Sequence, residues 1–275
     1  IPEEELINFI RDLGLDTIKN DRKVIAPQEI DVLIPEFKLG IEFDGLWYHS
    51  NQRIPSTYHM QKTEDAEAQG YRLIHIFEDE WKKNRPLVES KLRHLLGKSE
   101  HRYYARNLTL REVLLSERRP FFTRTHLQGD TGAKICYGLY DNDNNLLMAA
   151  SFKKSRFRQK EHFELIRLST ELNTSVVGGA SKLIKYARSV LGPLVSYADR
   201  RWSTGGVYSE WDYLGKTDPG YFWCKGVNRI SRYKITRKNL MSMDTYSEDK
   251  SQREIMEEAG YWRIFDCGHL IFFYP

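Results

Sequence analysis

Several features are scarce in this sequence of 275 residues. It contains no apolar run of about eighteen residues, which is the length that a membrane-spanning helix requires. Residues 1–5 match neither a signal peptide nor a transit peptide, so we expect a soluble, intracellular protein. The three cysteines, Cys136, Cys224 and Cys267, form no C-x-x-C pair, which indicates neither a disulfide framework nor a cysteine-based zinc site. Repeats of solenoid length and low-complexity tracts are also absent.

The composition is that of a globular protein with a small basic excess. Hydrophobic residues make up 40% and charged residues 29% of the chain, and the formal net charge is +4. A positive charge permits a phosphate-rich partner but does not prove one. The length fits one large domain or two ordinary ones. A new pattern begins after the charged stretch 97–101, so we predict two domains, residues 1–101 and 102–275.

Hydrophobic periodicity predicts an α/β fold of the mixed (α+β) kind in both halves. In the first half the expected elements are a helix over residues 3–13, strands over 30–34 and 39–43, a helix over 58–69, a strand over 71–77 and a helix over 87–96. In the second half they are strands over 135–140, 146–152 and 164–168, a helix over 180–191 and a strand over 194–197. We expect the last thirty or so residues to form a helix and a short β-hairpin that close the structure.

Two acidic residues lie on the strand pair predicted over residues 30–34 and 39–43. A hairpin brings Asp31 and Glu42 to one face, where two carboxylates make a hard oxygen site of the kind that Mg²⁺ prefers. An ion held there can polarise a scissile phosphodiester and ready a water molecule for in-line attack. Two acidic residues beside a turn are more often simply solvated, so the spacing alone leaves both interpretations open.

The sequence around these carboxylates favours the metal site. The relevant motifs, in order, are Glu29-x-Asp31, Ile41-Glu42-Phe43-Asp44-Gly45-Leu46-Trp47-Tyr48-His49-Ser50, Tyr58-His59-x-x-Lys62, Gly70-Tyr71-Arg72-Leu73-Ile74 and Glu78-Asp79-Glu80-Trp81. Over about residues 3–96 they resemble the very-short-patch-repair endonucleases and the related phage homing endonucleases. The spacing of the acidic residues looks like the PD-(D/E)XK nuclease core, with Asp44 in place of the usual lysine. The resemblance implies a mixed sheet flanked by helices.

The resemblance also implies roles for individual residues. Asp31 matches the metal-binding aspartate, and Glu3 matches the glutamate of the N-terminal helix, with Glu4 as the fallback. His49 matches a histidine that works at the scissile phosphate. Asp44 stands where the mismatch-repair enzymes carry another histidine, which leaves the general acid/base open.

His59 and Lys62 are further candidates. His49 and His59 have the near-neutral pKa that proton transfer at a phosphate needs, although either can be a packed, structural histidine. Lys62 lies one helical turn after His59 and can neutralise developing phosphate charge, or it can lie on a solvated helix face. Asp65 shares that face and ranks below Lys62.

Aromatic residues follow the acidic motif directly. Trp47 and Tyr48 can stack on bases or wedge between them, whereas core packing is the stronger interpretation for Trp81. The mismatch-repair enzymes hold a structural zinc ion through cysteines and a histidine. Because no cysteine precedes Cys136 here, we expect no zinc.

A glycine pair, Gly178-Gly179, opens a predicted helix of the second domain and is followed by Ser181 and Lys182. Free backbone N–H groups at a helix start can cradle a phosphate, although the pair can equally be a plain loop-to-helix turn. Residues 105–240 resemble the phage Mom-type DNA-modification proteins, a branch of the GNAT acyltransferase superfamily. The resemblance implies a GNAT-like α/β domain with acyl-CoA pyrophosphate near the glycines. It also puts Asp199 at a reactive centre, unless Asp199 only pairs with the arginines that follow it.

A basic and aromatic ribbon comes next in the sequence. Arg229, Arg232, Lys234 and Arg237 are interleaved with aromatic residues such as Tyr233. Such a ribbon suits contacts with a phosphate backbone, and an ordinary solvated face would not need so many aromatics. We therefore expect these residues to bind DNA.

Together these features predict an endonuclease dependent on Mg²⁺ or Mn²⁺ that hydrolyses phosphodiester bonds in double-stranded DNA, with a second domain that grips the duplex. The expected setting is a phage homing nuclease in the cytoplasm of an infected bacterial host, without a membrane partner. Two alternatives stay open: a DNA-modifying acyltransferase of the Mom type, and a catalytically inactive DNA-binding protein, which the substitution at Asp44 keeps in view. Monomer and homodimer are both compatible with the sequence.

Overall fold

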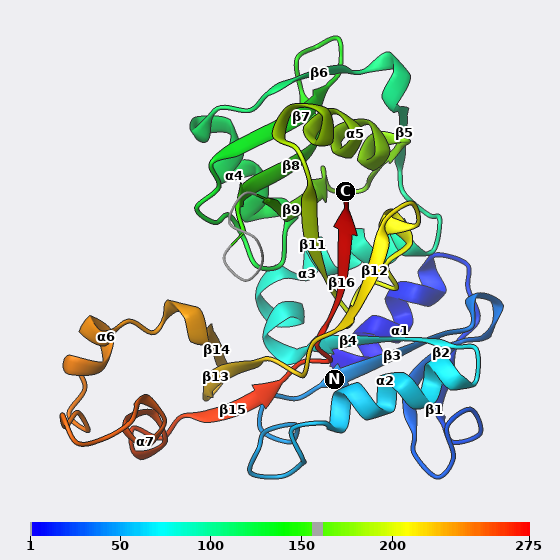
Figure 1. The fold of residues 1–275 in the computed structure, drawn as a ribbon. Coiled ribbons are helices and arrows are strands. Elements are labelled where there is room, and N and C mark those ends of the chain that lie inside the picture. Colours follow the sequence, from blue (N-terminus) through cyan, green and yellow to red (C-terminus); the bar gives the residue numbers. More distant parts are fainter. Residues whose placement is uncertain (1, 156–161) are drawn as a thin grey trace. The chain divides into compact units, whose positions relative to one another are not determined.

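The computed structural model describes residues 2–155 and 162–275 (Figure 1). The chain forms two compact units, and each gathers segments that are far apart in the sequence. Unit 1 consists of Ile1–Lys83, Asp199–Trp202 and Thr217–His269, and unit 2 consists of Asn84–Ala198, Ser203–Lys216 and Leu270–Pro275. These units differ from the expected division after residue 101, because two later segments pack with the N-terminal residues.

Unit 1 contains a four-stranded sheet in the order β1-β2-β3-β4. The first three strands are antiparallel, and β4 runs parallel to β3. The elements are α1 (Pro2–Asp12), β1 (Ile18–Asp21), β2 (Ile30–Ile34), a 3-10 helix (Pro35–Phe37), β3 (Leu39–Asp44), α2 (Tyr58–Ala68), β4 (Arg72–Phe77) and α3 (Glu78–Leu95). The helices expected over 3–13 and 58–69 and the strands expected over 30–34, 39–43 and 71–77 are confirmed, with small shifts at their ends.

The helix expected over residues 87–96 is longer than predicted. It begins at Glu78, where acidic residues in the first turn favour a helix N-terminus, and its backbone is non-helical at Asn84. Pro86 follows two residues later and cannot donate a helical hydrogen bond. The bend falls where the chain passes from unit 1 to unit 2. Trp81 is buried, as expected.

The inner face of α2 is polar. Its buried residues, His59, Lys62, Thr63 and Ala66, recur at the spacing of one helical turn. A helix normally buries an apolar stripe, and burying polar side chains is costly unless they find partners. Lys62 and Thr63 have partners on β3 and β4, and His59 and Thr63 also contact residues of the C-terminal segment. The helix thus covers a polar cluster.

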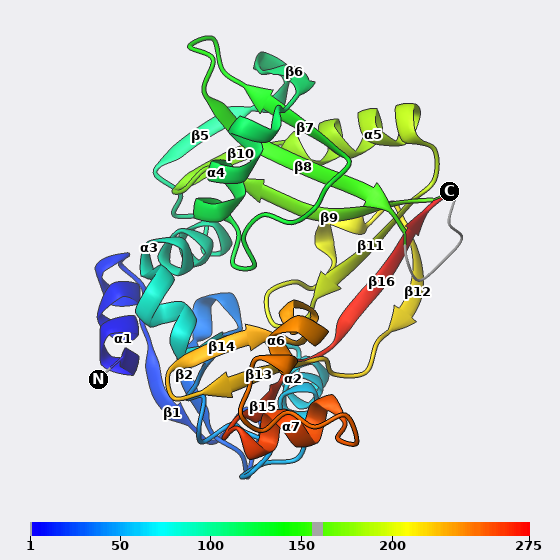
Figure 2. The same cartoon turned by 90° about the vertical axis from the view of Figure 1, so that its left-hand side faces the viewer.

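Unit 1 also contains a three-stranded antiparallel sheet built from the returning C-terminal segment, in the order β14-β13-β15 (Figure 2). Its elements are β13 (Tyr221–Lys225), β14 (Asn228–Ser231), a 3-10 helix (Arg232–Lys234), α6 (Arg237–Met241), α7 (Gln252–Glu258) and β15 (Trp262–Phe265). Leu46 and Phe77 pack with Cys224 and Ile264 in one apolar cluster. This cluster ties the second sheet to the N-terminal residues.

The prediction of a C-terminal β-hairpin is wrong, because β15 does not pair with the strand that follows it. β15 pairs with β13, whereas β16 (His269–Tyr274) pairs with β12 (Asp212–Lys216) in another sheet. Between them Gly268 has a positive φ of 74°, and a Cβ there would meet the backbone of Thr217 at 2.4 Å. The chain therefore passes from one sheet to the other at this glycine. The expected C-terminal helix is present as α7.

Unit 2 is built on a seven-stranded sheet in the order β12-β16-β11-β9-β8-β7-β6. Along β7, Tyr137 and Leu139 pack with residues of α5, whereas Cys136 and Tyr140 pack with residues of α4, so the two helices cover opposite faces. The elements not yet given are β5 (His101–Tyr104), a 3-10 helix (Ala105–Asn107), β6 (Thr109–Glu112), α4 (Leu115–Thr125), β7 (Ile135–Tyr140), β8 (Leu146–Lys154), β9 (Phe163–Thr170), β10 (Thr174–Val177), α5 (Gly179–Leu191), β11 (Leu194–Asp199) and a 3-10 helix (Gly206–Tyr208).

Both units mix helices with sheets, which confirms the α/β class predicted from the sequence. Among the described residues, no helix is both long and apolar enough to cross a membrane.

Candidate active site

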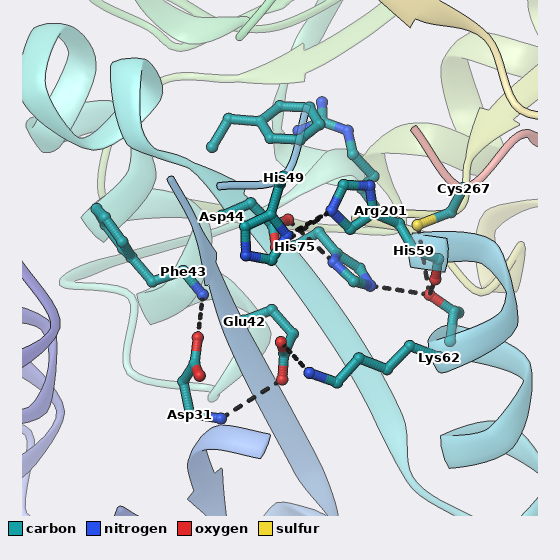
Figure 3. A network of polar contacts seen from close by, with 12 residues as sticks. Asp31, Glu42, Phe43, Asp44, His49, His59, Lys62, His75, Arg201 and Cys267 are labelled. Atoms are coloured by element: carbon teal, nitrogen blue, oxygen red, sulfur yellow. Dashed lines mark hydrogen bonds and ion pairs between the residues drawn. The ribbon is translucent and has the colours of Figure 1, made fainter. Parts of the chain in front are cut away.

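Asp31 and Glu42 meet where β2 and β3 pair (Figure 3). The Phe43 N–H donates to Asp31 Oδ2 at 2.7 Å, and the Asp31 N–H donates to Glu42 Oε1 at 3.4 Å. From α2, Lys62 donates to Glu42 Oε2 at 2.5 Å. Glu42 is 1% exposed and Lys62 is 4% exposed, so solvent screens this ion pair little. The structure thus brings together three residues that the sequence singled out.

Burial dominates the electrostatics of the carboxylate pair. It raises the pKa of Asp31 to about 6, against the opposing effects of the Phe43 N–H and Lys62. Burial and the neighbouring Asp31 raise the pKa of Glu42 to about 8. Burial acts to lower the pKa of Lys62, but Glu42 outweighs it and the pKa is raised. Two carboxylates share one ammonium group, so the pair is short of positive charge.

Three glutamates of α1 have different partners. Burial is the main cause of the raised pKa of Asp31, and repulsion from Glu3 adds to it. Glu4 forms an ion pair with Lys19, and Glu5 accepts a hydrogen bond from Trp81 Nε1. Glu3, rather than the fallback Glu4, is therefore the α1 carboxylate whose charge contributes to the raised pKa of Asp31.

Three histidines surround Asp44 at the end of β3 (Figure 3). Asp44 Oδ1 lies 3.0 Å from His49 Nδ1 and 3.4 Å from His59 Nε2. Its Oδ2 lies 3.0 Å from His75 Nδ1. The rings of His49 and His59 are stacked, and their Nδ1 and Nε2 atoms are 2.8 Å apart. The residue that departs from the nuclease motif is thus the centre of a histidine cluster.

The Phe265 carbonyl fixes the tautomer of His59. A carbonyl oxygen only accepts, so its 2.6 Å contact with His59 Nδ1 places a proton on that nitrogen. In the neutral ring, Nε2 is then an acceptor, and the His49 Nδ1–H donates to it. Asp44 Oδ1 accepts no hydrogen bond from any residue in the described ranges. Its other oxygen accepts from His75.

Asp44 and two of the histidines, His49 and His75, have shifted pKa values. Burial acts to raise the pKa of Asp44, but His59, His49 and His75 outweigh it and hold the pKa well below its usual range. Burial lowers the pKa of His75 to about 4 and also lowers the pKa of His49. Neutral imidazoles beside an ionised carboxylate are the form in which these groups bind metals.

Sequence reasoning missed the contribution of the C-terminal segment to this site. Besides the Phe265 carbonyl, Cys267 Sγ lies 3.3 Å from Thr63 Oγ1, which is also 3.0 Å from His75 Nε2. Burial raises the pKa of Cys267, so its thiol stays protonated. Residues separated by about two hundred positions therefore hold one cluster, and no local pattern reveals that.

Arg229 lies in a buried ion-pair network rather than on the surface expected to bind DNA. Glu80, which is 2% exposed, accepts from Arg229 at 2.6 Å and from Arg201 at 3.1 Å. Arg201 also pairs with Asp199 at 3.0 Å, which is the ion pair that the sequence left open. Both guanidinium groups lie over the Phe77 ring. These contacts occupy Arg229, because a buried guanidinium needs anionic partners.

The other residues expected to bind DNA are more accessible. Trp47 and Tyr48 are 42% and 73% exposed and directly precede His49. Lys234 and Arg237 are exposed, whereas Arg232 is half-buried and stacks on two tyrosine rings. Exposed aromatic residues therefore lie on the N-terminal segment of unit 1, and exposed cations lie on its segment Thr217–His269.

The glycine pair of unit 2 is explained by its own packing. Gly178 has a positive φ of 74° and caps α5, and a Cβ on Gly179 would lie 2.5 Å from Met148 Sδ. Lys182 donates to two backbone carbonyls at 2.7 and 2.9 Å, and Ser181 is exposed. These contacts favour the loop-to-helix turn over a phosphate cradle.

No protein-family model and no curated protein matches the chain. Among solved structures, the catalytic domain of the homing endonuclease I-Bth0305I is similar at 18% identity and a TM-score of 0.29, covering 35% of this chain and 93% of that one. A histone acetyltransferase HPA2 and related acetyltransferase from Corynebacterium glutamicum is similar at 12% identity and a TM-score of 0.36, covering 62% of this chain and 96% of that one. Similarity at this level does not establish a shared fold.

Two members of the site, His75 and Thr63, had a usable sequence signal. His75 interrupts an otherwise apolar strand, and a buried polar residue needs a partner. Thr63 lies one helical turn after His59, on the face that also carries Lys62. A polar stripe at core-facing helical spacing indicates a site rather than a solvated surface.

Asn at position 31 is expected to stabilise the metal-free fold. Burial raises the pKa of Asp31 to about 6, so the folded chain binds the proton of this carboxyl group more tightly than the unfolded chain does. The free energy of unfolding therefore falls as the pH rises from about 4 to 6. Asn keeps the shape without the charge. In EDTA at about pH 8, Asp31→Asn should therefore raise the free energy of unfolding by about 1–3 kcal/mol. Denaturant unfolding measures this gain, which should shrink towards zero near pH 4; a less stable variant at pH 8 would contradict it.

Proposed function

We propose that the chain is a divalent-metal-dependent endonuclease acting on double-stranded DNA, with its active site in unit 1. The observation that carries this proposal is the buried pair Asp31–Glu42. Burial raises the pKa of both carboxyl groups, and Lys62 supplies the ammonium group beside them. Such a pair opposes folding, and strongly shifted carboxylates grouped in one place are typical of functional sites.

The donor set fits magnesium or manganese. Both are hard cations, and Mg²⁺ is usually held by one or two carboxylates, with water and substrate phosphate as further ligands. Asp31 and Glu42 would hold the ion, and Glu3 adds negative charge near Asp31. When bound, the ion polarises the scissile phosphate and lowers the pKa of a bound water molecule.

Lys62 supplies the cation that the protein itself provides. Its ion pair with Glu42 holds the ammonium group beside the carboxylates, where negative charge develops on a phosphate during attack. The backbone N–H of Phe43 fixes one oxygen of Asp31, which limits the orientation of that carboxylate. These contacts preorganise the site before substrate arrives.

The direct test is incubation of supercoiled plasmid with the purified chain in Mg²⁺, and in parallel in EDTA. We expect nicked or linear DNA in Mg²⁺ and unchanged plasmid in EDTA. An intact plasmid in Mg²⁺, with protein that is folded by circular dichroism, would overturn the proposal.

Duplex binding should weaken steeply with salt. Each neutralised phosphate releases counterions and contributes about −0.9 to the log–log slope on B-DNA. Charge reversal at the exposed residues Lys234 and Arg237 should flatten the slope by about 1–2, whereas reversal at Lys98, an exposed lysine of unit 2, should not. Fluorescence anisotropy with a labelled duplex measures it. An unchanged slope would move the DNA surface towards Trp47.

A further inference from the structure

The donor atoms of Asp44, His49 and His59 are spaced like ligands of one ion (Figure 3). Asp44 Oδ1, His49 Nδ1 and His59 Nε2 form a triangle with sides of 3.0, 3.4 and 2.8 Å. Two ligand atoms that bind zinc at about 2.1 Å, with an angle of about 90–110° between the bonds, lie roughly 3.0–3.4 Å apart. Two of the three sides lie in this range, and the third, at 2.8 Å, is slightly shorter. The three atoms are therefore arranged much like one face of a coordination shell.

Hydrogen bonds do not satisfy all three atoms of this triangle, because Asp44 Oδ1 has no donor in the described part of the chain. His59 Nδ1–H is used by the Phe265 carbonyl, so His59 Nε2 presents a lone pair, and Asp44 Oδ1 presents another 3.4 Å away. Without a metal, the His49 Nδ1–H is donated to His59. Metal binding requires the other neutral tautomer of His49, in which the proton is on Nε2 and Nδ1 offers a lone pair. Asp44 is 0% exposed, and its Oδ1 accepts no hydrogen bond within the described part of the chain. A buried anionic oxygen without a donor is costly, and a cation between these atoms would remove that cost.

We infer that Asp44, His49 and His59 bind a divalent transition metal ion of the zinc class. Two imidazoles and one carboxylate are the ligand set of open, three-ligand sites for such ions. Metal-binding histidines usually donate their other ring N–H to a carbonyl, as His59 does to Phe265. His75 holds the second oxygen of Asp44 and so orients the carboxylate.

This ion is distinct from the one proposed at Asp31 and Glu42. The two ligand sets share no residue: the first consists of Asp31 and Glu42, and the second of Asp44, His49 and His59. The side chain of His49 is 21% exposed, so the open positions of the ion can take water or an oxygen ligand such as phosphate. The inference does not depend on the nuclease proposal.

The expectation that no zinc is bound rested on the positions of the cysteines. The ligands here come instead from a strand end, the following loop and α2, and the Phe265 carbonyl sets the tautomer of His59. Histidine ligands spread in this way give no spacing motif of the kind that cysteine pairs give.

Titration of the metal-free chain with Co²⁺ tests the inference. We expect one equivalent to bind with the intense visible absorption of a four- or five-coordinate site, and Zn²⁺ to displace it. His49→Ala, which alters a partly exposed side chain, should keep the fold and weaken Co²⁺ binding by about 100-fold or more. The matched control is His101→Ala, an exposed histidine of unit 2, which should bind Co²⁺ like the wild type.

The outcomes separate this site from the nuclease proposal. Asp31→Asn should leave the Co²⁺ spectrum unchanged while cleavage in Mg²⁺ is lost. Absence of saturable Co²⁺ binding, or equal binding by the wild type and folded His49→Ala, would overturn the metal site and leave the nuclease proposal standing. A normal Co²⁺ site in a chain that does not cleave DNA would overturn the nuclease proposal alone.

Discussion

Asp31→Asn is expected to slow Mg²⁺-dependent DNA cleavage by about 1000-fold while leaving the fold and duplex binding nearly intact. The substitution removes the charge that would hold the ion but preserves an oxygen that can accept from the Phe43 N–H. Metal-ion stabilisation of the transition state is worth several kcal/mol, and each 1.36 kcal/mol is a factor of about 10 in rate. Single-turnover cleavage at saturating protein measures the loss.

A matched control makes this result specific. Asp16→Asn is the same chemical change at an exposed position and should cleave at the wild-type rate. Duplex affinity, measured in EDTA, should be similar for both variants and the wild type. If Asp31→Asn cleaves as fast as Asp16→Asn, the ion is not held at Asp31 and the assigned site is wrong.

A fragment that ends at Lys98 is expected not to fold. Truncation removes Arg201 and Arg229, the partners of Glu80, and an uncompensated buried charge costs about 3–5 kcal/mol. It also exposes Leu46 and Phe77, which lose their packing against the second sheet. Since the net stability of a domain is only about 5–15 kcal/mol, these losses together remove most or all of it.

Amide hydrogen–deuterium exchange and denaturant unfolding test this expectation. The fragment should exchange rapidly throughout and show no cooperative transition, whereas the full chain should protect β3 and β4 under the same conditions. A cooperative fragment that cleaves DNA in Mg²⁺ would show that the N-terminal residues are a self-sufficient nuclease domain.

The N-terminal elements could be predicted because their signals are local. Residues 30–34 and 39–43 are short β-branched runs interrupted by a turn, and residues 58–69 have helical spacing closed by Gly70. Each pattern is complete within a dozen residues or so. Local propensity and tertiary packing therefore agree in this part of the chain.

The composition of the units could not be predicted in the same way. Strand β15 pairs with β13 across an intervening segment that contains two helices, and β16 leaves for another sheet after Gly268. From the sequence, β15 and β16 look like the two arms of a hairpin, because they are short and separated by a turn. Which strand each one joins depends on long-range packing that periodicity does not encode.

The same limit applies to the candidate site. Asp31, Glu42 and Lys62 were found because hairpin and helix geometry place them from local spacing. Arg229 was misplaced because a basic residue in an aromatic stretch looks like a DNA contact. Its actual partners, Asp79 and Glu80, lie 150 and 149 positions earlier in the sequence. Charge patterns show that a cation is present, but not whether it faces solvent or a buried anion.

The central claim is that Asp31 and Glu42 hold a divalent ion against a DNA phosphate, and crystals of the chain with duplex DNA and Mn²⁺ test it most directly. An anomalous difference map at the manganese edge should show a peak bonded to Asp31 and Glu42 and to a phosphate oxygen of the duplex. The inferred site at Asp44 and His49 predicts a second, separate peak after soaking with Zn²⁺. A well-ordered duplex bound elsewhere, with no manganese at Asp31, would contradict the account.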